Sequence, residues 1–185
     1  MATLIQNPFT PLDTEVIFVI AYQRTWDGTG RPTHFSATNL AGTQYFDARI
    51  VWKGMNQKAD EWDEIMDAEG TNFIEYQFGN GVLMRDKATR VREAFGEWLE
   101  GFDRWQMWTD DLMERSVWLS HLGMTGYNVM DLSTAAFLLG VNFGNERRKA
   151  LHYVRNQQNA GSPGHYARVG ITIINRIKNG IESRN

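Results

Sequence analysis

The sequence predicts an α/β fold in which helices pack on the faces of a mixed sheet. Three observations support this prediction. Residues 16–25 are rich in β-branched and aromatic residues and lead to Asp27-Gly28, a strong hairpin signal. An apolar stripe with helical spacing begins at Val91, and short apolar strands alternate with helices beyond it. The 185 residues can bury a substantial core, so we expect residues 1–185 to form a single domain.

The first half of the chain has the pattern of strands. Residues 3–6 form a short apolar start, and residues 16–25 and 33–37 are expected to pair as an antiparallel hairpin. Residues 46–52 are a further strand or extended segment. Between 56 and 85 we expect a short acidic amphipathic helix around Trp62, an extended segment over 73–78, and a turn at Gly79-Asn80-Gly81.

The second half alternates helices and strands. The pattern turns helical from residue 86, with an apolar stripe from Val91 to Phe102 and with Gly101 at the expected end of the helix. A buried strand over 104–109 follows, and then a helix over 112–122 that Gly123 ends. A short strand over 127–130 is followed by two helices, which Asp131 and Asn145 are expected to cap. A last helix over 165–178 completes a sheet of about five strands with helices on its faces.

Composition excludes several classes of function. The chain has no cysteine, so it forms neither a disulfide framework nor a thiolate metal site. Its longest apolar run, residues 16–22, is too short to span a bilayer, and its first residues lack the positive region of a signal peptide. We therefore expect a cytoplasmic protein with no membrane partner.

Charge is unevenly distributed along the chain, although the formal net charge is only −3. Residues 60–69 are acidic. Residues 132–185 carry eight basic residues against the acids Glu146 and Glu182, a balance of +6. The basic residues are Arg147, Arg148, Lys149, Arg155, Arg168, Arg176, Lys178 and Arg184. Such asymmetry is compatible with a nucleic-acid-binding face and equally with two solvated helix faces.

The most specific motif is Gly164-His165-Tyr166-Ala167-Arg168-Val169-Gly170. With Asp131-Leu132-Ser133-Thr134 before it, this segment resembles the final motif of the DEDDh 3′–5′ exonucleases of the RNase H-like superfamily, small bacterial and phage-type stand-alone domains above all. The resemblance implies an RNase H-like exonuclease fold over nearly the whole chain. It also implies that His165 stands at the general base and that Gly170 replaces the last metal-binding Asp.

The other acids of the family pattern are also replaced. The family's first strand ends in a pattern like Phe-Ile-Asp-Thr-Glu, and the matching stretch here, residues 4–12, has Gln6 and Pro8 at the two acidic positions. In the second motif, our preferred alignment places Arg115 at the catalytic Asp, while Asp111 or Glu114 takes that place after a shift of one helical turn. Two-metal cleavage needs several carboxylates to hold two cations. The resemblance therefore implies a pseudoenzyme without a metal cofactor.

Three functions follow from this resemblance. The first is binding of single-stranded nucleic acid, in which Arg115 pairs with a phosphate and the basic residues Arg147, Arg148, Lys149, Arg155 and Arg168 follow the backbone. The second is binding of a protein partner through the acidic segment, as an inhibitor or assembly subunit. The third is an active exonuclease that holds Mg²⁺ or Mn²⁺ through displaced carboxylates, for which the candidates are Asp13, Glu15, Asp110 and Asp111. The sequence does not determine the oligomeric state.

Overall fold

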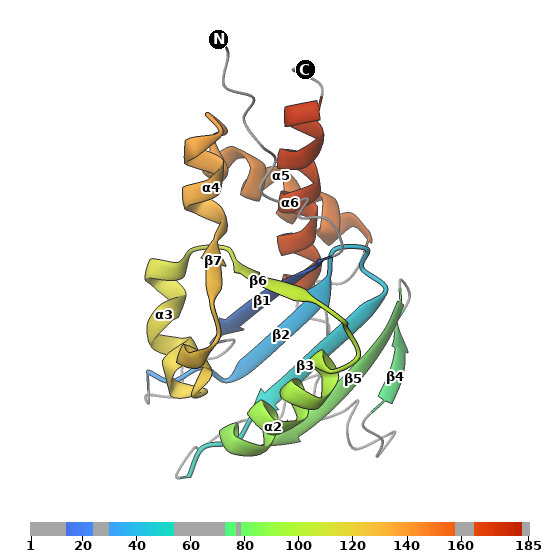
Figure 1. The fold of residues 1–185 in the computed structure, drawn as a ribbon, viewed down its shortest axis with the longest axis vertical. Helices are drawn as coiled ribbons and strands as arrows, with labels where there is room; N and C mark the ends of the chain where they lie inside the picture. Colours follow the sequence, from blue (N-terminus) through green and yellow to red (C-terminus); the bar gives the residue numbers. More distant parts are fainter. Residues whose placement is uncertain (1–13, 24–29, 54–72, 77–78, 158–164, 183–185) are drawn as a thin grey trace.

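In the residues that the structure describes, seven strands form one mixed sheet with helices on both faces (Figure 1). The computed structural model describes residues 14–23, 30–53, 73–76, 79–157 and 165–182. The strands are β1 (Glu15–Tyr22), β2 (His34–Asn39), β3 (Gln44–Ile50), β4 (Phe73–Tyr76), β5 (Gly79–Asp86), β6 (Trp105–Thr109) and β7 (Val129–Asp131). The helices are α2 (Ala88–Leu99), α3 (Leu112–His121), α4 (Leu132–Leu138), α5 (Phe143–Gln157) and α6 (His165–Glu182), with a 3₁₀ turn at Met124–Gly126.

The strands lie in the order β4-β5-β3-β2-β1-β6-β7. As expected, β1 and β2 are antiparallel neighbours, with Tyr22 opposite His34. Strand β3 continues the antiparallel run, whereas β6 joins β1 and β7 joins β6 in parallel. The carboxyl ends of β1, β6 and β7 therefore point the same way, and the segments that follow β6 and β7 begin at the same end of the sheet.

The prediction of about five strands was wrong, because β4 and β5 extend the sheet beyond β3. Gly79-Asn80-Gly81 is the start of β5 rather than a turn: Asn80 lies opposite Gln44 and Gly81 opposite Tyr45 in a parallel ladder with β3. Glycines lower the intrinsic preference for a strand, but pairing on both sides outweighs that preference here. The predicted strand at residues 3–6, the turn at Asp27-Gly28 and the acidic helix lie outside the described residues.

Two apolar clusters, one on each face of the sheet, form the core. Alternate residues of β1, namely Ile17, Val19 and Ala21, pack with β2, β3, α2 and α3. The residues between them, Val16, Phe18 and Ile20, pack against α4, α5 and α6. Strand β1 is buried on both faces because it lies between β2 and β6 and helices pack over each face of the sheet, which explains its continuous apolar sequence.

The helices differ from expectation at their ends. Asp131 caps α4 as predicted, and its side chain accepts a hydrogen bond from the backbone N–H of Thr134. Asn145 is not the cap of α5. The helix begins at Phe143, and the Asn142 side chain accepts a hydrogen bond from the Asn145 N–H. Helix α6 extends to Glu182, four residues beyond the predicted Lys178. Within the part of the chain that the structure describes, every helix is too short or too polar to cross a membrane.

Candidate functional site

Helix α6 lies very close to β1 at Gly170. A Cβ atom at this position would lie 2.1 Å from Cε1 of Phe18, well inside van der Waals contact. Phe18 is 1% exposed and belongs to the cluster that joins β1 to α6. The ring of Phe18 therefore fills the space that a side chain at position 170 would need. A carboxylate side chain cannot be placed at 170 while Phe18 stays in its position.

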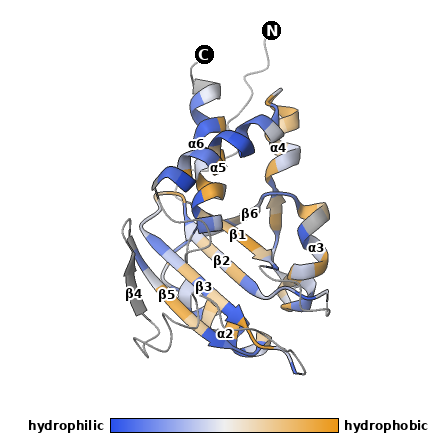
Figure 2. Ribbon diagram, turned by 180° about the vertical axis from the view of Figure 1, so that it is seen from behind, coloured by the Kyte–Doolittle hydropathy of each residue, from blue (hydrophilic) through white to orange (hydrophobic). Residues whose placement is uncertain are grey.

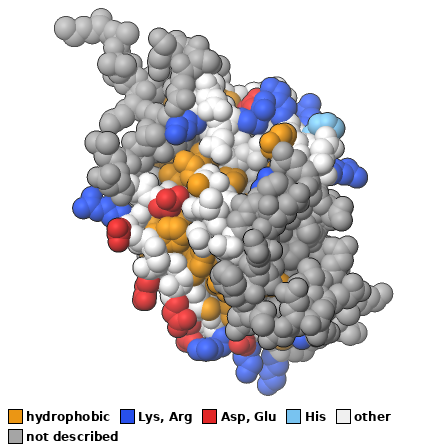
Figure 3. Space-filling view, turned by 90° about the vertical axis from the view of Figure 1, so that its right-hand side faces the viewer, with side chains coloured by type: hydrophobic (Ala, Val, Ile, Leu, Met, Phe, Trp, Pro, Cys, Tyr) orange, Lys and Arg blue, Asp and Glu red, His pale blue; other side chains and the backbone are white. Residues whose placement is uncertain are grey.

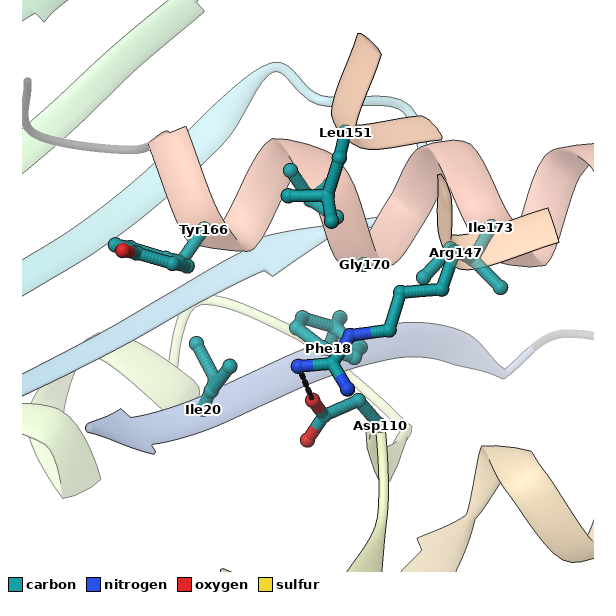
Figure 4. Close-up of a pocket in the computed structure, with 9 residues that line it drawn as sticks. Phe18, Ile20, Asp110, Arg147, Leu151, Tyr166, Gly170 and Ile173 are labelled. Atoms are coloured by element: carbon teal, nitrogen blue, oxygen red, sulfur yellow. Dashed lines mark ion pairs between the residues drawn. The ribbon is translucent and has the colours of Figure 1, made fainter. Parts of the chain in front are cut away.

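A small pocket opens beside this contact (Figure 4). Its walls are mainly apolar, and its cavity volume is about 30 Å³. The lining residues come from β1, α5, α6 and the end of β6: Phe18, Ile20, Asp110, Arg147, Leu151, Tyr166, Val169, Gly170 and Ile173. About two water molecules fit in such a volume. The pocket therefore admits a small polar group and excludes a nucleobase.

The single carboxylate of this pocket is bound by two arginines. Asp110 follows β6, and its side chain is 4% exposed. Arg115, one turn into α3, donates to both carboxylate oxygens, from Nε at 2.9 Å and from Nη2 at 3.1 Å. Arg147 of α5 lies with Nη2 3.6 Å from the same carboxylate, and its side chain is 41% exposed. These three side chains carry a formal charge of +1, and Arg147 is the cation that solvent reaches.

The loop at the ends of β6 and β7 is fixed by a second carboxylate, Asp131. Its side chain accepts from the N–H of Leu112 at the start of α3, and from Ser133 and Thr134 at the start of α4. The N–H of Ser133 in turn donates to the carbonyl of Asp110. Burial alone would raise the pKa of Asp131, but these hydrogen bonds outweigh burial and lower it below its ordinary value of 3.8. Asp131 therefore links α3, α4 and the pocket.

Replacing Asp131 by alanine is expected to lower the free energy of unfolding by about 1–2 kcal/mol, because both helix starts lose a hydrogen-bond acceptor. Since the folded-state pKa is depressed, this contribution is present above the unfolded-state value and is lost as pH falls through the folded-state value. Urea unfolding between about pH 6 and pH 2 measures it. The difference between wild type and Asp131→Ala should shrink toward the acid end. A difference that is constant with pH would show that the charge of Asp131 contributes nothing.

Helix α5 carries the basic surface next to the pocket. Figure 2 shows hydrophilic colouring over most of this helix. Arg148 and Arg155 are exposed, one on each side of Leu151 in sequence. Glu146, the only acid of α5, is bound by Lys149 at 2.9 Å and by Arg176 of α6 at 2.7 Å. Burial would raise the pKa of Glu146, but these two cations lower it overall, so Glu146 is charged and already paired at neutral pH.

His165 and Arg168 lie away from this surface. His165 is buried and packs edge-on against Tyr166, with 5.2 Å between ring centroids. Arg168 is half-buried, and its Nη1 donates to the hydroxyl of Tyr45 on β3 at 3.3 Å. Burial raises the pKa of Tyr45, although the charge of Arg168 opposes the rise. Among the described residues, it is Tyr166 rather than His165 that lines the pocket.

Of the candidate displaced carboxylates that the structure describes, Glu15 does not lie near Asp110 and Asp111. Gln6, Pro8 and Asp13 lie outside the described residues. Glu15 begins β1 opposite Trp105, whereas Asp110 follows the far end of β6, about 16 Å along the parallel strands at about 3.3 Å per residue. Asp111 precedes α3, next to Asp110. In the described part of the chain, His, Asp and Glu form no group of three that could hold a metal ion.

Comparison with known proteins returned no match to this chain among protein-family models, curated proteins or solved structures.

The sequence singled out Asp110, Arg115, Arg147 and Gly170, and the structure brings these four together. It did not single out Phe18, Ile20, Leu151 or Tyr166, which form most of the apolar wall. The only sequence signal for Phe18 and Ile20 was that they alternate with Ile17 and Val19 along one strand. This alternation shows which residues share a face of β1, but it does not show which helix packs on each face.

Proposed function

We propose that this protein binds nucleic acid without cleaving it, on a framework of the RNase H-like exonuclease type. One observation carries the proposal: the only carboxylate that lines the described pocket, Asp110, is already bound by Arg115, and the partly exposed Arg147 adds a positive charge beside it. Such a site repels divalent cations and attracts an anion.

The order of the elements supports the framework. The antiparallel strands β1, β2 and β3 come first, and α2, β6, α3, β7 and the last helices follow, which is the order on which the resemblance to the exonucleases was based. Strands β4 and β5 lie between β3 and α2, and β5 is parallel to β3. In the described sheet, β1 is the strand that adjoins both β6 and α6. We therefore place the family's first two acidic positions, two residues apart on one strand face, at Phe18 and Ile20. Gln6 and Pro8, which the sequence comparison placed there, lie outside the described residues.

The pocket residues do not fit a two-metal centre. Phe18, Ile20 and Gly170 offer no ligand atom in their side chains, and both oxygens of Asp110 accept from Arg115. Mg²⁺ gives up its water shell reluctantly and needs carboxylates that are free to bind it. The pocket therefore does not support a metal-dependent cleavage step.

An anionic group fits the same place. The side chain of Arg147 lies at a longer distance from Asp110 than that of Arg115 does, so its donors are available to a phosphate oxygen. Arg148 and Arg155 continue the positive charge along α5. Figure 3 shows several basic side chains at the upper end of one face of the molecule and others at its left-hand side and lower end, where most of the acidic side chains in that view lie. A phosphate backbone that contacts Arg147 would thus continue over α5.

The salt dependence of binding tests the proposal. With about three phosphate contacts, the logarithm of the association constant for a labelled oligonucleotide should fall against the logarithm of salt concentration with a slope of roughly −2 to −3. Arg148→Ala/Arg155→Ala should reduce this slope by about 1.5. Lys87→Ala/Arg90→Ala, which removes two exposed charges at the start of α2, is the matched control and should leave the slope unchanged. Undetectable binding at low salt, or equal effects of the two double variants, would rule the proposal out.

A protein partner remains the competing prediction. The acidic segment 60–69, on which that prediction was based, lies outside the described residues. The basic helix α5 and the cationic pocket favour nucleic acid.

A further inference from the structure

Two arginines hold the buried carboxylate of Asp110, and they hold it unequally. Arg115 donates to both carboxylate oxygens at 2.9 and 3.1 Å, its side chain is 7% exposed, and its guanidinium lies over the ring of Trp118. Arg147 approaches the same carboxylate only to 3.6 Å, which is longer than a charge-assisted hydrogen bond, and its side chain is 41% exposed. Arg115 is therefore a fixed partner of Asp110, whereas Arg147 is a partner that a ligand can draw away.

We infer that Asp110 is a built-in competitor for the phosphate group that Arg147 binds. Arg147 reaches from α5 toward Asp110 and pairs with it, so a phosphate has to take Arg147 from an acid of the protein itself (Figure 4). The inference rests on the proposed nucleic-acid binding and adds how that binding is controlled: Asp110 weakens it. Arg115 is the positioning residue that keeps Asp110 in this place.

The exchange of partners leaves no buried charge alone. When Arg147 turns to a phosphate, both oxygens of Asp110 still accept hydrogen bonds from Arg115, and the buried pair of opposite charges stays intact. If Arg115 left instead, a guanidinium and a carboxylate that are both almost fully buried would be separated, which is strongly unfavourable. Arg147 is therefore the member of this group that can change partner, and its exposed side chain has the freedom to do so.

Asp110 opposes binding because it carries the same sign of charge as a phosphate. The pocket beside Arg147 has room for about two water molecules, so phosphate oxygens that enter it also come close to Asp110. Like charges repel appreciably at such a site, where the effective dielectric constant is well below that of water. A single phosphate group is therefore bound weakly. A ligand with several phosphates overcomes the repulsion, since Arg148 and Arg155 contact its other phosphates along α5.

Binding of a labelled oligonucleotide to Asp110→Asn tests the inference. Asparagine keeps the shape of Asp110 and an oxygen that accepts from Arg115, but it removes the charge that competes for Arg147. We expect Asp110→Asn to bind about tenfold more tightly than wild type at low salt. In the Arg147→Ala background the same substitution should change the affinity by less than about twofold, because no cation is left to be released. A gain as large as the one with Arg147 present would overturn the inference.

Glu146→Gln is the matched control. It removes one negative charge beside Arg147 in sequence, so the net charge changes by the same amount as in Asp110→Asn. Glu146 is bound by Lys149 and Arg176 rather than by Arg147, and its loss should change the affinity by less than about twofold. Equal gains in the two variants would indicate a general effect of net charge, and Asp110 would not be a specific competitor.

A second variant decides the question if Asp110→Asn is too unstable to be measured. Asp110→Ala/Arg115→Met removes the competitor together with its fixed partner, so its net charge equals that of the wild type. It should nevertheless bind the oligonucleotide about tenfold more tightly, because Arg147 is released. An affinity at or below that of the wild type would contradict the inference.

Inorganic phosphate separates failure of this inference from failure of the proposed function. Its binding is measured as a rise in the midpoint of thermal unfolding, with Arg147→Ala as the reference for general salt effects. If the oligonucleotide binds wild type and Asp110→Asn equally, Asp110 is not a competitor and nucleic-acid binding stands. If the oligonucleotide binds neither form but phosphate stabilises Asp110→Asn more than wild type, the competition stands and nucleic acid is not the ligand. If neither ligand binds either form, both are wrong.

Discussion

Replacing Asp110 by alanine is expected to destabilise the protein by about 3–5 kcal/mol, the largest effect that we expect from one polar substitution. Both Asp110 and Arg115 are almost fully buried, with side chains 4% and 7% exposed. Alanine leaves the Arg115 guanidinium buried without the carboxylate that accepts two of its hydrogen bonds, and Arg147 then adds a like charge nearby. Urea unfolding followed by circular dichroism measures the loss.

The double variant Asp110→Ala/Arg115→Met identifies the cause. It removes both charges and keeps an unbranched side chain of similar length beside Trp118, which the Arg115 guanidinium overlies at 5.3 Å from the ring centroid. We expect the double variant to recover at least half of the stability lost in Asp110→Ala, since replacing a buried pair by apolar groups is often nearly neutral. A double variant that is less stable than Asp110→Ala would contradict this explanation and would indicate that Arg115 stabilises the fold through its other contacts.

Replacing Gly170 by alanine is expected to cost about 3 kcal/mol, at the upper end of the effects of overpacking a core. The new Cβ would lie 2.1–2.3 Å from three ring atoms of Phe18, and the ring is enclosed within the cluster of β1 and α6. Either the ring leaves its position or α6 moves away from the sheet. Thermal and urea unfolding of the single variant should show the loss.

Two further variants make this prediction specific. Gly180→Ala changes another glycine of α6, where no atom lies within 4 Å of the added Cβ, and it should be neutral or stabilising by about 0.5–1 kcal/mol. Phe18→Leu shortens the opposing side chain, so Gly170→Ala should cost less in that background than in wild type. Equal costs in the two backgrounds would show that contact with Phe18 is not what limits position 170.

The contact with Phe18 gives a packing reason for Gly170. The proposed exonuclease framework would account for Gly170 as the loss of a carboxylate, whereas the geometry shows that a residue with any side chain would displace Phe18. The two explanations are compatible: once an aromatic ring occupies the facing position on β1, glycine is the residue that fits. Restoring an acid at 170 alone is therefore expected to unfold the site rather than to rebuild it.

Local sequence patterns predicted several elements well. The inner stripe of α6, with Ala167, Ile174 and Ile177 fully or almost fully buried, follows from helical spacing alone. The antiparallel pairing of β1 and β2 followed from two β-rich runs joined by a turn signal. The cap at Asp131 was also predicted, because Asp is a favoured residue directly before the first turn of a helix.

The patterns failed where a partner distant in sequence decides the structure. Gly79-Asn80-Gly81 has the composition of a turn, but pairing with β3 makes it part of a strand. The sequence predicted Asn145 as the cap of α5, whereas the structure has Asn142 in that role. Asn is a favoured N-cap residue at either position, and the conformation of the chain between α4 and α5 selects Asn142. Distance along the chain likewise gave no way to exclude Glu15 as a partner of Asp110.

The sequence by itself determined the class of the fold, the strands and helices with strong periodicity, and the excess of positive charge in the last third of the chain, because these depend on the spacing and type of neighbouring residues. Only the tertiary structure decided that Phe18 meets Gly170, that Arg115 and Arg147 share Asp110, and that Glu15 stands at the opposite end of the strands from Asp110. These contacts join residues up to 152 positions apart, from Phe18 to Gly170. Their geometry follows from strand order and helix packing, which no local pattern specifies.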